Sequence, residues 1–195
     1  MRLNRTIAVR CLLLFALFNL TLLLTGCTDT WVSSANGIIS ALIPAINAAL
    51  AILAAFGIGV SPEALAAIQA WGTSAQNTLT NVVKPAIDAY NTAAAATQAT
   101  LLTEIDAALN SIVSGLSTTL AAIHITDPAS QAKITAIFAV IQAFMVSLIN
   151  LIPVLKNEVK DPVKAHELVR AVKPAKEFKT EFNNLTKEYG SKYTI

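Results

Sequence analysis

The stretch "ITAIFAVIQAFMVSLINLIPVL", Ile134–Leu155, contains no charged residue and repeats large apolar side chains at steps of three and four. Steps of this size place the side chains on one face of an α-helix. The sequence therefore predicts a helix whose apolar face packs against other helices of a bundle. The predicted stripe consists of Ile134, Ile137, Ile141, Phe144, Leu148, Leu151 and Leu155.

Three further stripes with the same spacing precede this stretch, in a chain rich in alanine that shows no strand-like alternation. We therefore expect an all-α fold: an antiparallel bundle of about four Ala-rich helices over residues 37–155, followed by a charged C-terminal helical segment. The three stripes are Ile39, Ile43, Ile46, Leu50 and Leu53; Leu65, Ile68, Ala75, Leu79 and Val82; and Leu102, Ile105, Leu109, Ile112, Leu116 and Ile123, the last interrupted by Thr119.

Helix starts are marked by a capping side chain followed by proline at Ser61, Asp127 and Asp161. Proline suits the first helical position because its missing N–H has no partner there. Pro85 should kink or break the helix in which it lies. We expect a turn between Asn91 and Thr100, because a helix without one would be on the order of 90 Å long.

The C-terminal region, residues 156–195, has fifteen charged residues, against eight in residues 28–155. Pro174 divides it into a short helix, Pro162–Lys173, and a longer one. The longer helix carries an apolar stripe that has two interpretations: it covers one side of the bundle, or it docks on anionic lipid or on a partner beside the neighbouring lysines. This stripe consists of Phe178, Phe182, Leu185 and Tyr189.

The first residues are basic, with Arg2, Arg5 and Arg10, and the short apolar run Cys11–Leu24 follows them. A basic head, a short apolar core and a small-residue exit are typical of a secretory signal. The exit "LTGC", which is Leu24, Thr25, Gly26 and Cys27, resembles the lipobox of bacterial lipoproteins. The resemblance covers residues 1–27. It implies a signal peptide over residues 1–26, a diacylglycerol on the Cys27 sulfur, and a lipidated N-terminus with a short linker over residues 27–36.

The lipoprotein interpretation implies a bacterial envelope protein that binds the membrane through its acyl chains, palmitate among them, with no cofactor besides the covalent lipid. In enterobacterial lipoproteins an Asp after the cysteine favours the inner membrane; Thr28 stands there, so the outer membrane is favoured. An ordinary cleaved signal and an uncleaved anchor remain alternatives. With Cys11 removed and Cys27 acylated, no thiol pair is left for a disulfide or a thiolate metal site.

Two windows without charge, 38–60 and 134–155, are long enough to span a bilayer. Pro44 and Asn47 in the first window, polar residues in the second, and the lack of basic flanks argue against spanning. We therefore favour a bundle that is tethered by Cys27. A membrane-inserting pore or scaffold is the alternative.

The sequence contains no motif that indicates a catalytic site. His166 begins "HELVR", but the fifth position of a zinc-protease motif must be histidine, and here it is Arg170. His124 suits a helix end, and Glu104 and Asp106 point in different directions on a helix. We expect no catalytic or metal site and no nucleic-acid partner, because the mature chain has eleven basic and twelve acidic residues. The sequence favours a non-enzymatic role in which the bundle or its tail binds an envelope protein or an apolar ligand.

Overall fold

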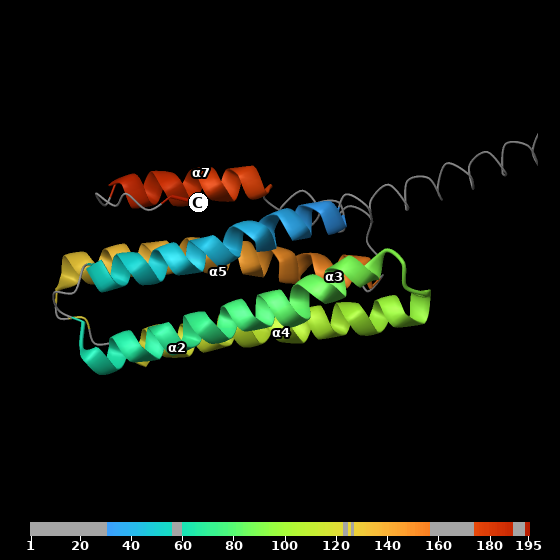
Figure 1. Cartoon of the computed structure of the whole chain (residues 1–195), viewed down its shortest axis with the longest axis horizontal. Helices are drawn as coiled ribbons and strands as arrows, with labels where there is room; N and C mark the ends of the chain where they lie inside the picture. Colours follow the sequence, from blue (N-terminus) through green and yellow to red (C-terminus); the bar gives the residue numbers. More distant parts are fainter. Residues whose placement is uncertain (1–30, 56–59, 123–124, 126, 157–173, 189–193) are drawn as a thin grey trace, which may run out of the picture.

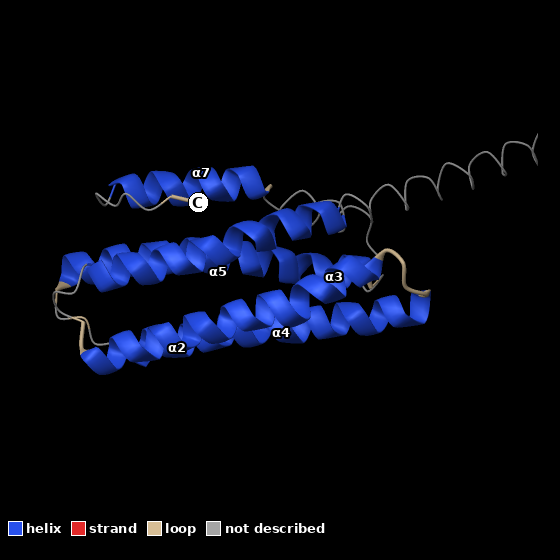
Figure 2. Ribbon diagram, viewed as in Figure 1, coloured by secondary structure: helices blue, strands red, loops and turns tan. Residues whose placement is uncertain are grey.

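The computed structural model describes residues 31–55, 60–122, 125, 127–156, 174–188 and 194–195, and within them the protein is all-α (Figures 1 and 2). These residues contain no strand, only an isolated bridge between Val60 and Ile125. The elements are the first helix, Trp31–Ala55; α2, Pro62–Thr78; the π-helical segment η1, Leu79–Val83; α3, Lys84–Tyr90; α4, Ala95–Ala122; α5, Pro128–Leu155; and α7, Ala175–Glu188.

The segments α2, η1 and α3 form one continuous helix, and along the chain the first helix, this continuous helix, α4, α5 and α7 alternate in direction (Figure 1). The first helix and α5 lie side by side in the middle layer, α2 to α4 form the layer on one side, and α7 covers the other side. Contacts join α2 to α4, α4 to α5, and α5 to α7. The predicted antiparallel bundle with a C-terminal helical segment is therefore confirmed.

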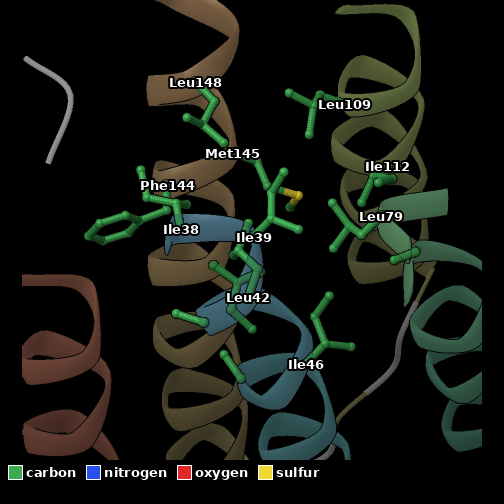
Figure 3. Close-up of a cluster of buried hydrophobic side chains, with 14 of the residues drawn as sticks. Ile38, Ile39, Leu42, Ile46, Leu79, Leu109, Ile112, Phe144, Met145 and Leu148 are labelled. Carbon is green, nitrogen blue, oxygen red and sulfur yellow. The ribbon is translucent and has the colours of Figure 1, made fainter. Parts of the chain in front are cut away.

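The core is built from the predicted stripes and from a second apolar face on the middle layer. Figure 3 shows side chains of the first helix between those of α5 and those of η1 and α4. The stripe of α5 is buried from Ile134 to Leu151, while Leu155 is partly buried. Ile123, predicted to end the stripe of α4, lies outside the described residues. The additional buried residues of the middle layer, which the stripes missed, include Ile38, Leu42, Ile52, Phe138, Met145 and Ile152.

The helix does not break at Pro85, because the π-helical segment η1 precedes it. The backbone from α2 through η1 to α3 stays right-handed helical at every junction. The N–H of Lys84 bonds the carbonyl of Leu79, five residues back. A wider turn of this kind relieves the clash of a proline ring with the preceding turn. The extra residue also shifts the stripe, so that Val83 is buried where we expected Val82.

The turn that we expected between Asn91 and Thr100 lies at Asn91–Ala94, immediately before α4. The side-chain amide of Gln98 donates to the carbonyl of Tyr90 (3.0 Å) and thereby ties the start of α4 to the end of α3. The hairpin is thus closed by a local hydrogen bond, without the glycine or proline that usually marks such a turn.

Two of the three predicted caps are confirmed. The Ser61 hydroxyl accepts from the N–H of Ala64 (3.1 Å), and Asp127 accepts from the N–H of Ser130 (2.8 Å). Hydrogen bonds from the side chain and backbone of Ser130 hold the pKa of Asp127 below its ordinary value. Asp161 lies outside the described residues, as does the predicted helix Pro162–Lys173.

The first helix already includes residues 31–36, which the sequence analysis assigned to the linker. Trp31, Val32 and Ala35 are buried in the core. These six residues therefore belong to the bundle, because their apolar side chains continue the buried face of the helix.

The last described helix, α7, begins after Pro174, as predicted, and packs on α5. Phe178 lies 4.3 Å from Phe144, ring centroid to ring centroid, and 6.0 Å from Phe182. Asn183 holds the C-terminal residue in two ways: its Nδ2 donates to the carbonyl of Ile195 (3.2 Å), and its Oδ1 accepts from the N–H of Ile195 (2.9 Å).

We predict that the substitution Asp127→Asn makes thermal unfolding less dependent on pH. Asparagine also caps a helix, but it lacks the charge that suits the N-terminal dipole. Because the pKa of Asp127 is lowered in the folded state, its contribution is present above the unfolded value and is lost as pH falls through the folded value. The wild-type melting temperature should exceed that of the variant at pH 6, and the gap should close below about pH 4. A gap that is constant with pH would contradict this account.

Candidate functional site

Polar and aromatic side chains gather at the end of the bundle where the first helix begins. We call this group the Trp31 cluster; its members are Trp31, Asn36, Lys84, Asp88 and Tyr90. The rings of Trp31 and Tyr90 meet edge to face, with centroids 5.4 Å apart and an angle of 64° between the planes. Tyr90 is the last residue of α3, so this contact joins the start of the first helix to the α3–α4 turn. Burial raises the pKa of the Tyr90 hydroxyl.

Asp88 connects the two helices through its carboxylate. Its Oδ2 accepts a hydrogen bond from Lys84 Nζ (2.7 Å), one turn earlier in α3, and its Oδ1 accepts one from Asn36 Nδ2 (2.8 Å). Both hydrogen bonds lower the pKa of Asp88, and the bond from Lys84 has the larger effect. Lys84 and Asp88 are 44% and 47% exposed, so the ion pair contributes little to stability. The bond from Asn36 fixes the register of the first helix against α3.

Two atoms of the Trp31 cluster lack a hydrogen-bond partner among the described residues, Trp31 Nε1 and Asn36 Oδ1. Trp31 is only 5% exposed. Buried tryptophan N–H groups usually find an acceptor, because an unpaired one loses its hydrogen bonds to water without replacement. The Trp31 cluster therefore contains one buried donor and one buried acceptor for which the described residues provide no partner.

A groove of about 350 Å³ lies between α2 and α4 on the outer layer of the bundle. Its lining combines small apolar side chains, hydroxyl groups and one indole ring, and none of these lining side chains is charged. It therefore offers apolar contact and hydroxyl hydrogen bonds, but its lining holds no acidic or basic side chain that could activate a hydroxyl as a nucleophile. The lining residues are Ala67, Ala70, Trp71, Ser74, Ala75, Thr78, Ser111, Ile112, Gly115 and Thr119.

Trp71 forms the base of this groove and is fixed on three sides. Its Nε1 donates to the carbonyl of Ile112 (3.0 Å), and its ring meets Phe138 of α5 edge to face at 5.5 Å. A Cβ on Gly115 would lie 3.3 Å from Trp71 Cδ1, so glycine gives the indole room to approach α4. Trp71 therefore packs between α2, α4 and α5.

The residues predicted as sites fall into two groups. Cys27 and the other lipobox residues, Leu24, Thr25 and Gly26, lie outside the described residues. Of the aromatic stripe, Phe178 and Phe182 are fully buried, Leu185 is partly buried, and Tyr189 lies outside the described residues. In this arrangement the described part of the stripe covers the bundle, which is the first of its two interpretations, and is not exposed for docking.

The described residues bring together no group of three or more histidine, cysteine, aspartate or glutamate side chains that could hold a metal ion. His124 and His166 lie outside that part of the chain. Asp106 accepts from Asn110 Nδ2 (2.8 Å), and Glu104 is exposed on the same helix.

Sequence reasoning missed the Trp31 cluster. The spacing of Lys84 and Asp88, four residues apart, is a signal for a helical ion pair. Nothing in the sequence links Asn36 to Asp88 or Trp31 to Tyr90, because these contacts depend on how two distant helices align.

The chain matches no protein-family model, no curated protein and no solved structure.

We predict that Trp71→Phe lowers the free energy of unfolding by about 1–3 kcal/mol, through the lost hydrogen bond to Ile112 and the space left beside Gly115. The matched variant Trp31→Phe should cost less, because it removes an N–H that has no partner among the described residues. Urea denaturation of both variants measures the difference. Equal losses would show that the hydrogen bond of Trp71 contributes nothing.

Proposed function

We propose that the protein is a bacterial envelope lipoprotein, anchored by a diacylglycerol on Cys27, with a non-enzymatic binding or structural role. The lipobox Leu24–Cys27 behind a basic, apolar leader supports the anchor. Thr28 after the cysteine favours the outer membrane over the inner membrane. Acyl chains contribute about 0.8 kcal/mol per buried methylene, so two or more chains hold a protein stably on a bilayer.

The main support for a bundle that its lipid alone holds on the membrane is the orientation of the two most apolar helices, the first helix and α5. Most of their large side chains are buried, and their exposed positions hold small or polar residues. A helix in lipid has the opposite need, since its outer face meets hydrocarbon. The exposed residues are Ser33, Ser34, Ser40, Asn47, Ala54 and Ala55 on the first helix, and Pro128, Ala129, Gln131, Ala132, Thr135, Ala139, Ala143 and Asn150 on α5.

A binding role is supported by the outer face of α2 and α4. No charged residue occurs between Glu63 and Lys84, nor in α4 after Asp106. The exposed positions there are Ala, Ser, Thr, Asn and Gln, and the groove above Trp71 lies among them. Small side chains let another helix approach closely, and the groove offers hydroxyl groups beside a smaller apolar surface. This face is where we place an envelope protein partner or an apolar ligand.

The alternative function is a membrane-inserting assembly, a pore or scaffold that spans with 38–60 and 134–155. Trp31–Ala55 and Pro128–Leu155 are long and apolar enough to cross a membrane, with mean hydropathies of 2.3 and 2.2. The same values suit core helices, and 56% and 44% of these windows are buried inside the protein. Insertion would require the bundle to open, because the large side chains of both helices now face the core.

We predict that residues 28–195, exported behind an ordinary cleavable signal, will be soluble and monodisperse, whereas the full-length chain will stay with the membrane. Burial of both apolar helices leaves no exposed spanning segment among the described residues, so we expect the lipid to hold the chain on the membrane. Fractionation with an alkaline wash measures this difference. Retention of the acyl-free chain after the wash would favour the inserting assembly.

The lipid itself is tested separately by metabolic labelling with palmitate. Full-length protein should incorporate the label, and Cys27→Ser should not. Absence of label from the full-length chain would refute the lipoprotein proposal, whatever the fractionation shows.

A further inference from the structure

The position of the lipid anchor limits which part of the bundle can face the membrane. This inference rests on the proposed acylation of Cys27. Four peptide steps separate Cys27 from Trp31, and such a segment spans at most about 14 Å. Trp31 opens the first helix and contacts Tyr90 at the end of α3. The end of the bundle that holds the Trp31 cluster must therefore lie close to the bilayer surface.

The Trp31 cluster identifies the end of the bundle that the tether enters. Trp31 Nε1 and Asn36 Oδ1 have no partner among the described residues, but both atoms are buried and do not reach a lipid headgroup in this arrangement. Exposed residues outside the cluster must therefore make the contact with the lipid.

The outermost part of this end is the α3–α4 turn (Figure 1). The segment from Asn91 to Thr100 contains no charged residue. Its side chains are mostly exposed, and they are small or neutral: alanine, threonine, asparagine and glutamine. Such a surface can enter the headgroup layer without the cost of removing a charge from water.

We propose that the bundle stands on the bilayer on this end, with the α3–α4 turn in contact with the lipid headgroups and the Ser61 and Asp127 caps pointing away. The occupant of this surface is the membrane that carries the anchor. The helices then run roughly along the membrane normal, and the groove above Trp71 opens sideways, clear of the lipid.

Two exposed threonines on α4 test the orientation. Thr97 lies in its first turn and Thr118 near its other end, roughly 30 Å apart along the same helix. The mature lipoprotein offers no competing thiol, since Cys11 leaves with the signal and Cys27 is acylated. Thr97→Cys and Thr118→Cys can each be labelled with the fluorophore NBD and reconstituted into phosphatidylcholine vesicles that carry a nitroxide on a fraction of the headgroups.

We expect the nitroxide to quench the label at residue 97 at least twofold more strongly than the label at residue 118. Equal quenching, or stronger quenching at residue 118, would overturn the end-on orientation. Flotation of the vesicles separates this failure from failure of the anchor. Protein that floats without the expected difference keeps the anchor and loses the orientation, whereas full-length protein that does not float refutes both.

Discussion

Burial of the first helix is the interaction on which the rest of the structure depends. Trp31–Ala55 carries buried side chains on most of its circumference, from Trp31 to Leu53. It can be so apolar only because α5 lies beside it, α2 to α4 cover one side and α7 covers the other (Figure 1). The expected absence of a disulfide leaves hydrophobic burial as the dominant stabilising term. The direction of the exposed faces, which supports the tethered form that we propose, follows from this burial.

Helix content, caps and the stripes of α4 and α5 could be predicted from the sequence, because each depends on residues within one or two turns of each other. The second buried face of the middle layer could not, since Ile38 or Met145 is buried by helices that lie far away in the chain. The contacts of the Trp31 cluster could not be predicted for the same reason, since they join helices that are distant in the chain. Val83 is buried where we expected Val82. This local prediction was wrong because helical periodicity assumes 3.6 residues per turn, and the π-helical segment beside Pro85 inserts one extra residue.

The two candidate surfaces lie on different parts of the described molecule. The Trp31 cluster lies where the covalent tether would enter, and the groove above Trp71 lies on the uncharged face of α2 and α4. The helix α7, which carries charged residues, forms the opposite layer (Figure 1). Its two phenylalanines are fully buried. Anchoring and recognition would thus use different parts of the bundle, and neither requires a titrating side chain.

The order of the helices in the middle layer has a consequence for biosynthesis. A ribosome makes the first helix early, but α5 follows only after α2, η1, α3 and α4, and α7 comes last. Until then the two most apolar helices lack their native cover, and Phe144 lacks Phe178. On the export route that we propose, the chain would cross the inner membrane before its two most apolar helices are covered, so a chaperone that binds unfolded chains would affect how much of the protein folds.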